Sequence, residues 1–130
     1  MSNKELMELA IKARENSYSP YSDFCVGAAL LAKSGKVYLG CNIENAAFSP
    51  TNCAERTAFF TAVAAGEREF EAIAVCGGKR GEKRVTCTPC GVCRQVMSEF
   101  CDKNFKIILE DSEALKVYSL GELLPLAFNL

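Results

Sequence analysis

The sequence predicts an α/β sandwich with a mixed sheet, on two observations. Between residues 24 and 43, two strand patterns flank a glycine turn, which indicates a hairpin. Beyond the hairpin, helical and strand patterns alternate, an order typical of helices packed on a sheet. The chain has 130 residues, 49% of them hydrophobic, which is the size and composition of one domain with its own core. We therefore expect a single domain over residues 1–130.

A helix is expected at the N-terminus. Ser2 and Glu5 have the spacing of a capping box, in which the serine caps the helix and the glutamate reaches back to it. The segment from Ser17 to Pro20 ends this helix, because the residue before a proline disfavours helical geometry. Apolar residues recur between these signals at helical spacing, at Leu6, Leu9, Ala10 and Ala13.

Strands and helices then follow in series. Residues 24–32 and 37–43 are predicted strands, and Ser34-Gly35-Lys36 between them predicts the hairpin turn. A helix is predicted from Cys53 to Ala65, and Gly66 marks its end. The remaining predicted elements are a strand at 70–76, a helix from Cys90 to Cys101, a strand at 105–109, a short strand at 115–118 and a short helix at 120–124.

Composition and charge argue against several classes of protein. The formal net charge is −1, whereas nucleic-acid binding depends on clustered lysine and arginine. The loop from Lys79 to Arg84 is basic, but Glu82 interrupts it, and such charge runs are usually solvated. The N-terminus lacks the pattern of a secretory signal, and no apolar run approaches the roughly 18 residues of a membrane span. We expect a cytoplasmic protein that binds neither nucleic acid nor membrane.

Two of the cysteine motifs carry the chemistry. The chain has eight cysteines, and in a reducing compartment metal binding or buried thiols are favoured over disulfides. Cys53-Ala54-Glu55 and Pro89-Cys90-Gly91-Val92-Cys93 each stand at a predicted helix start, where free N–H groups and the helix dipole favour thiolates. Cys90 and Cys93 share one helical face, and Cys53 adds a third sulfur if the two helix starts meet. Three protein ligands leave one position open for water, as in catalytic zinc sites.

The charged residues next to these cysteines have two interpretations each. Arg56 follows Cys53 by three residues, and Arg94 follows Cys90 by four. Either guanidinium could hydrogen-bond a sulfur and draw charge off the metal, or could make an ordinary surface ion pair. Glu55 is not needed as a ligand. It could reach a zinc-bound water, or it could interact with the helix dipole or with Asn52.

Asn42 and Glu44 form a second candidate site. They are two residues apart near the end of a predicted strand, so their side chains share one face. An amide and a carboxylate in that arrangement can hold a ribose hydroxyl, or they can belong to a polar strand face in solvent.

Three blocks, in order, resemble the homotetrameric three-cysteine cytidine deaminases, and the resemblance covers nearly the whole chain. The blocks are Asn42-Ile43-Glu44-Asn45-Ala46, Cys53-Ala54-Glu55-Arg56-Thr57-Ala58 and Pro89-Cys90-Gly91-Val92-Cys93-Arg94-Gln95-Val96. Zinc deaminases carry a Pro-Cys-x-x-Cys motif and a glutamate that is not a ligand. The resemblance implies a three-layer α/β/α sandwich with a mixed sheet of about five strands.

The resemblance also implies roles for single residues. Cys53, Cys90 and Cys93 would hold one zinc per chain, and Glu55 would transfer protons. The hydrogen bond from Arg56 to a ligand sulfur is instead an expectation from its spacing after Cys53. Six residues are implied to contact the substrate. Within one subunit these are Phe24 against the base, Asn42 and Glu44 at the sugar, the Ala54 N–H at the pyrimidine carbonyl, and the Thr88 C=O at the amino group; the sixth is Phe128.

One implied role concerns assembly. Phe128 resembles a C-terminal aromatic residue that enters the site of a neighbouring subunit in a homotetramer. Phe48 stands where family members often have tyrosine, which removes one hydroxyl near the site.

The implied reaction is hydrolytic deamination of cytidine and deoxycytidine to uridine and deoxyuridine plus ammonia, in pyrimidine salvage. Such an enzyme is a hydrolase acting on a cyclic amidine. Zinc would convert its water to hydroxide near neutral pH, and the hydroxide would attack the amino-bearing carbon. Glu55 would take the water's proton, deliver it to the adjacent ring nitrogen, and later protonate the departing amine.

Other interpretations of the motifs stay open. Cys87, Cys90 and Cys93 begin a ferredoxin-type run, but Met97 stands where its fourth cysteine is expected. Cys87-Thr88-Pro89-Cys90 also resembles a redox C-x-x-C motif. Neither interpretation explains Cys53-Ala54-Glu55. A nucleic-acid base editor and a deaminase of a nucleoside antibiotic are further alternatives, and the latter should lack the pair of Asn42 and Glu44.

Overall fold

A five-stranded sheet forms the centre of the protein, in the order β2-β1-β3-β4-β5. The computed structural model describes residues 1–130. β1 pairs antiparallel with β2 and β3, β3 pairs parallel with β4, and β4 pairs antiparallel with β5. The sheet is therefore mixed, as predicted. Its strands are β1 (Phe24–Ala32), β2 (Val37–Cys41), β3 (Phe70–Lys79), β4 (Lys106–Asp111) and β5 (Ala114–Ser119).

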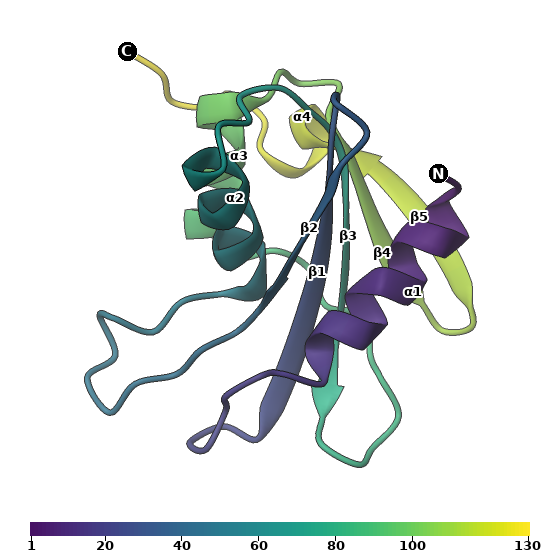
Figure 1. Ribbon diagram of the computed structural model, residues 1–130, viewed down its shortest axis with the longest axis vertical. Coiled ribbons are helices and arrows are strands. Elements are labelled where there is room, and N and C mark those ends of the chain that lie inside the picture. The colour runs from purple at the N-terminus through teal and green to yellow at the C-terminus, as the bar shows by residue number, and fades with distance from the viewer.

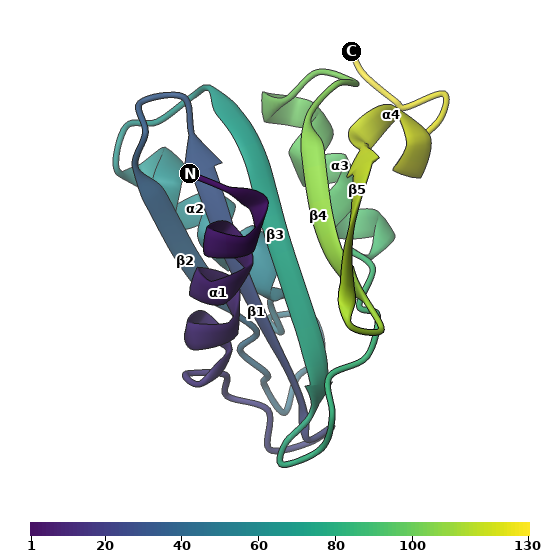
Figure 2. The same ribbon diagram turned by 90° about the vertical axis from the view of Figure 1, so that its right-hand side faces the viewer.

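Helices cover both faces of the sheet. α1 (Asn3–Arg14) packs on one face, and α2 (Ala54–Ala64), α3 (Gly91–Phe100) and the short α4 (Leu120–Leu123) lie on the other. Figure 1 shows the sheet between α1 on one side and α2 and α3 on the other, and Figure 2 shows α1 in front of the strands. This arrangement confirms the three-layer α/β/α sandwich. None of the helices is long and apolar enough to cross a membrane.

The two faces of the sheet bury separate cores. Alternate residues of β1 point to opposite faces, so Ala28 and Leu30 join the larger core under α2 and α3, while Ala29 and Leu31 join the smaller core under α1. The larger core is centred on Phe59 of α2, whose ring meets Phe70 edge-on with 5.0 Å between centroids. Because β1 is buried on both faces, its sequence is a continuous apolar run rather than an alternating one.

Two glycines let helices approach the sheet closely. A Cβ atom at Gly27 would lie 2.0 Å from the backbone oxygen of Ala10 in α1. A Cβ atom at Gly40 would lie 2.3 Å from the backbone oxygen of Ala54, at the first turn of α2. Because Gly40 has no Cβ atom, the start of α2 can lie directly against β2. This close packing sets the position of the Cys53-Ala54-Glu55 segment.

Strand ends differ from the prediction by two or three residues at β2, β3 and β4. β2 ends at Cys41 instead of residue 43, because the chain leaves the sheet there and Ile43 forms isolated bridges with Tyr18 and Asn52. β3 continues to Lys79 instead of residue 76, because its pairing with β1 extends to Phe24. β4 ends at Asp111 instead of residue 109, because its pairing with β5 extends to Ala114. The capping box of Ser2 and Glu5 agrees with the prediction, and all eight cysteines are free thiols.

Candidate active site

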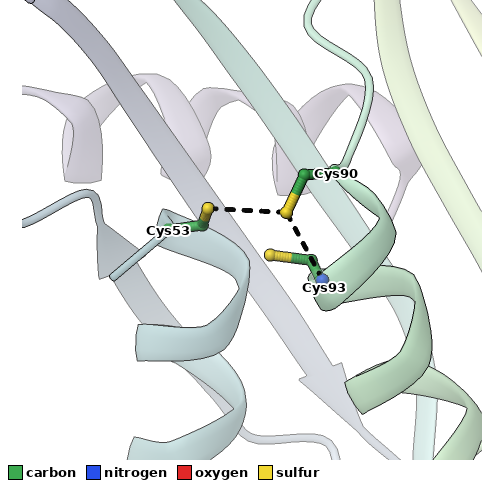
Figure 3. A group of neighbouring side chains, drawn as sticks. All are labelled: Cys53, Cys90 and Cys93. Atoms are coloured by element: carbon green, nitrogen blue, oxygen red, sulfur yellow. Dashed lines mark hydrogen bonds between the residues drawn. The ribbon is translucent and has the colours of Figure 1, made fainter. Parts of the chain in front are cut away.

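Three cysteines meet where α2 and α3 begin. Cys53 is the N-cap of α2, Cys90 is the N-cap of α3, and Cys93 lies in the first turn of α3. Their Sγ atoms all lie within 4.8 Å of one another, with 3.7 Å between Cys53 Sγ and Cys90 Sγ. Figure 3 shows the three side chains converging from the two helix starts. The structure thus brings together the three thiols that the sequence groups as metal ligands.

The thiol cluster fits a zinc ion. Two sulfurs bound to one tetrahedral zinc at about 2.3 Å lie about 3.8 Å apart, close to the separation of Cys53 and Cys90. Hydrogen bonds from the Cys93 thiol and from Arg56 lower the pKa of Cys53 to about 5. This sulfur is therefore a thiolate at neutral pH, the form that binds metal.

The two candidate arginines have different partners. Arg56 Nη2 donates a hydrogen bond to Cys53 Sγ at 3.2 Å, as the spacing on α2 predicts. Arg94, for which a sulfur contact was an open alternative, bonds backbone carbonyls instead. Its Nε donates to the Pro89 carbonyl at 2.7 Å and its Nη1 to the Leu123 carbonyl at 2.6 Å. Because these two carbonyls satisfy the guanidinium, Arg94 fixes the loop before α3 to the end of α4.

Glu55 is a buried carboxyl group at the start of α2, with 3% of its surface exposed. Burial, and then the charge of Cys53, raise the pKa of Glu55 to about 7. A glutamate that serves only the helix dipole is normally exposed and ionised. The alternative partner, Asn52, instead donates a hydrogen bond to Thr57 Oγ1 at 3.1 Å. Glu55 therefore has the burial and pKa of a proton-transfer group.

A cavity of about 270 Å³ opens beside the cysteines. Two metal-ligand candidates and Glu55 lie in its wall, together with five of the six residues expected to contact the substrate, all except Phe128. Cys93 is buried and Arg56 contacts Cys53 from outside the lining. The full lining consists of Ser22, Phe24, Val26, Asn42, Glu44, Thr51, Asn52, Cys53, Ala54, Glu55, Cys87, Thr88 and Cys90.

Sequence comparisons agree with this site. Residues 1–109 match the family described as the cytidine and deoxycytidylate deaminase zinc-binding region. A cytidine deaminase of Sporosarcina psychrophila is 48% identical over 130 residues, which cover 99% of this chain and 93% of the relative. The chain belongs to the cytidine deaminase family. A second relative, the cytidine deaminase of Halalkalibacterium halodurans, is 47% identical over 99% of this chain and 96% of its own.

Solved structures of the cytidine deaminase family have the same fold. The cytidine deaminase of Burkholderia pseudomallei superposes with a TM-score of 0.89 at 49% identity, over 98% of this chain and all of its own. That of Mycobacterium tuberculosis superposes with a TM-score of 0.84 at 35% identity, over 100% and 99% of the two chains. The family also accounts for Cys53-Ala54-Glu55, which the iron–sulfur and redox interpretations leave unexplained.

Asn42 and Glu44 do not form a solvated strand face in this chain. The Asn42 side chain donates to the Phe24 carbonyl at 2.8 Å and accepts from the Val26 N–H at 2.9 Å. The Glu44 carboxylate accepts from backbone N–H groups of the loop before β1, including that of Tyr21 at 2.9 Å. Both side chains line the cavity, and both also hold the chain around it.

Sequence reasoning missed five of the lining residues. Three of them, Ser22, Thr51 and Asn52, stand in the cavity wall because the loop before β1 and the loop between β2 and α2 fold toward each other. The turn signals in these loops predict their existence but not their contacts. A fourth, Val26, belongs to β1. Cys87 lines the cavity but is not part of the thiol cluster.

Phe128 lies apart from the cavity of its own chain. Its side chain is 67% exposed, and its backbone carbonyl accepts a hydrogen bond from Gln95 Nε2 at 3.2 Å. The tail that carries it extends away from the body beyond α4 (Figure 1). Phe128 therefore does not pack into the core of its own subunit.

Proposed function

We propose that the protein hydrolyses free cytidine and deoxycytidine to the corresponding uridines and ammonia, as a step of pyrimidine salvage. One observation carries this proposal. A single cavity is lined by Glu55, with a pKa of about 7, by Cys53 of the thiol cluster, and by Asn42 and Glu44. Acid–base chemistry and polar groups suited to a sugar thus meet in a space that suits a small ligand.

The cysteine cluster supports zinc as the cofactor. Cys53, Cys90 and Cys93 would hold one ion per chain, with the fourth position open. Bound zinc would supply Lewis-acid activation of the attacking water. Arg56 would draw charge from the Cys53 sulfur, which keeps a centre with three thiolates from becoming too anionic to act as a Lewis acid.

Glu55 would carry every proton in the reaction. Its carboxylate accepts one proton from the water that attacks C4 of the base, and delivers that proton to N3. It then takes the remaining proton of the new C4 hydroxyl and delivers it to the amino nitrogen. The C4–N4 bond breaks, the C4 carbonyl forms, and ammonia leaves. A pKa of about 7 suits a group that must act in turn as base and acid.

Backbone groups beside Glu55 would recognise the base. Ala54 begins α2, where N–H groups have no partner within the helix, so its N–H can donate to the pyrimidine carbonyl. The Thr88 carbonyl would accept from the amino group, and the ring of Phe24 would pack against the base. The support for these roles is that all three residues line the cavity.

Assembly and location complete the proposal. We infer a cytoplasmic homotetramer in which Phe128 of each subunit covers the nucleoside in a neighbour's cavity. The exposed position of Phe128, away from its own cavity, supports this role.

The test follows the ultraviolet absorbance of cytidine and deoxycytidine with purified protein. Loss of the cytosine band and release of ammonia are expected. A chelator should abolish turnover, and added zinc should restore it. Free cytosine, which lacks the sugar, should be a very poor substrate. Zinc-loaded protein that leaves both nucleosides unchanged would contradict the proposal.

A further inference from the structure

The loop before β1 is fastened to Glu44. The Tyr18 N–H donates to the Asn42 carbonyl at 3.0 Å, and the Glu44 N–H donates to the Tyr18 carbonyl at 2.8 Å. The Glu44 side chain then accepts from the N–H groups of Tyr21 and Ser22, at 2.9 and 3.1 Å, both at Oε1. Its second oxygen, Oε2, accepts from the Ser22 hydroxyl. Ser22 thus bonds Glu44 through both its backbone and its side chain.

The Ser22 hydroxyl has a fixed direction. Its oxygen accepts a hydrogen bond from the Phe24 N–H at 3.0 Å. A hydroxyl has a single proton to donate, and here that proton goes to Glu44 Oε2. Ser22 therefore links the backbone of Phe24, expected to pack against the base, to the carboxylate of Glu44.

A count of lone pairs shows what remains for a ligand. A carboxylate has about four acceptor positions. In Glu44 the two N–H groups fill Oε1 and the Ser22 hydroxyl takes one position on Oε2, so one acceptor position remains.

Asn42 has one free hydrogen-bond donor, which complements the free acceptor of Glu44. Its oxygen accepts from the Val26 N–H and from the Ser17 hydroxyl, which fills both of its lone pairs. Its NH₂ group donates one proton to the Phe24 carbonyl at 2.8 Å, so one donor proton remains. Asn42 and Glu44 therefore offer one donor and one acceptor in the same cavity wall. A sugar hydroxyl both donates and accepts, so it has the chemistry to pair with both groups.

We propose that Ser22 is a positioning residue for sugar recognition, whose hydroxyl fixes Glu44 so that one acceptor of its carboxylate, beside one N–H of Asn42, binds a single sugar hydroxyl. This proposal rests on the proposed nucleoside deaminase function. Ser22 itself need not touch the substrate, because it acts through Glu44.

The test uses three variants and three substrates. Ser22→Ala removes the hydroxyl, and Ser22→Thr keeps it. Ser34→Ala is the matched control, because Ser34 donates to Glu67 Oε2 at 2.6 Å in another exposed serine–glutamate pair, away from the cavity. Each variant is assayed for kcat/KM with cytidine, 2′-deoxycytidine and 3′-deoxycytidine.

Ser22→Ala should lower kcat/KM for cytidine about tenfold, as expected for the loss of one hydrogen bond to a charged group. The proposed function includes 2′-deoxycytidine as a substrate, so 3′-deoxycytidine is the substrate expected to lack the recognised hydroxyl. With that substrate the wild type should already be slow, and Ser22→Ala should have little further effect. Ser22→Thr should keep most of the wild-type activity, and Ser34→Ala should have the wild-type kcat/KM with all three substrates. An equal loss on all three substrates would show that Ser22 only holds the loop, and no loss on cytidine would also overturn the proposal.

A second measurement does not depend on turnover. Calorimetry gives the affinity of each variant for uridine, the product with the same sugar. Ser22→Ala should weaken uridine binding by about the same tenfold factor, and Ser34→Ala should not. If the wild type binds uridine but deaminates nothing, the proposed function is wrong, and the uridine affinities still decide the role of Ser22. If the wild type deaminates cytidine and Ser22→Ala binds uridine normally, the role of Ser22 is wrong and the function stands.

Discussion

Arg56 and Cys53 are joined by a hydrogen bond from Nη2 to Sγ, 3.2 Å long, within the first turn of α2. The guanidinium Nε is buried and has no partner. Arg56 is partly buried, and its guanidinium bonds a sulfur and makes no surface ion pair. A cation at this position offsets part of the negative charge that three thiolates would place on a metal.

Arg56→Gln should keep the fold but lower kcat for cytidine. Without the guanidinium, Cys53 pushes more charge onto the zinc, which then activates water less well. Changes to groups that hydrogen-bond metal ligands typically cost about 10–100-fold. Steady-state kinetics on protein of known zinc content will measure the effect. Arg68→Gln is the control, because Arg68 donates to the Val63 and Glu67 carbonyls at the other end of α2 and does not line the cavity. Equal kcat for Arg56→Gln and wild type would contradict the role of Arg56.

The metal ligands can be separated from their neighbour Cys87. Cys90→Ala should lose most of the zinc, because it removes one of three clustered sulfurs. Cys87→Ala should keep one zinc per chain, because Cys87 lies outside the cluster. Elemental analysis of the purified variants measures both. Zinc lost from Cys87→Ala and kept by Cys90→Ala would show that the ligands are wrongly chosen.

Glu55→Gln should fold and bind zinc but lose nearly all turnover. The amide keeps the size of the side chain and cannot exchange the protons of the reaction. Loss of general acid–base catalysis alone costs about 10²–10⁴-fold, and more where one group handles every proton. Circular dichroism and zinc content control for folding. Near-normal kcat with intact zinc would show that Glu55 only stabilises the start of the helix and transfers no proton.

Local signals in the sequence predict much of this structure. The capping box of Ser2 and Glu5 lies within one helical turn, and the face shared by Cys90 and Cys93 follows from their spacing. The meeting of Cys53 with that pair is a contact between two distant helix starts. The sequence does not show that the two helix starts meet. In the structure, the close packing at Gly40 helps to bring the start of α2, and with it Cys53, into place.

The parts that the sequence leaves unpredicted depend on contacts between distant segments. Ser22 and Glu44 are 22 positions apart, and no periodicity links a loop serine to a residue beyond a hairpin. Arg94 has a suitable spacing for a sulfur, yet it bonds Leu123, 29 positions away. A guanidinium can turn to any of several acceptors, so its spacing alone does not select one.

The thiols of the metal-free protein should react very unequally with iodoacetamide. The pKa of Cys53 is lowered to about 5, so it is a thiolate at pH 7 and loses reactivity as the pH falls through about 5. Burial, and then the charge of Glu55, raise the pKa of Cys87 to about 12. Cys87 is then a thiolate in only about one molecule in 10⁵ at pH 7.

Peptide mass spectrometry after brief labelling will measure this difference. Cys53 should be alkylated first, and Cys87 should stay unmodified together with Cys76 and Cys101, whose pKa values burial raises to about 11 and about 12. Zinc-loaded protein is the control, because the metal should protect Cys53. Labelling of Cys87 at the rate of Cys53 would contradict the assigned protonation states.

Phe128→Ala should keep the zinc and weaken cytidine binding. The side chain is exposed in its own subunit and does not line its own cavity, so its removal leaves the core unchanged. In the proposed tetramer the ring covers a neighbour's nucleoside and excludes water from that pocket. KM should therefore rise more than kcat falls. Circular dichroism, zinc content and light scattering establish that fold, metal and assembly are intact.

Mixing two damaged proteins tests whether Phe128 serves a neighbour. Phe128→Ala chains supply a normal Glu55, and Glu55→Gln chains supply a normal Phe128. If each site combines Glu55 of one subunit with Phe128 of another, some sites in a mixed tetramer contain both intact residues. Activity should then rise above that of either parent once mass spectrometry shows that subunits have exchanged. Exchange without a gain, while Phe128→Ala alone is clearly impaired, would mean that Phe128 acts only within its own subunit, and the shared site would be wrong.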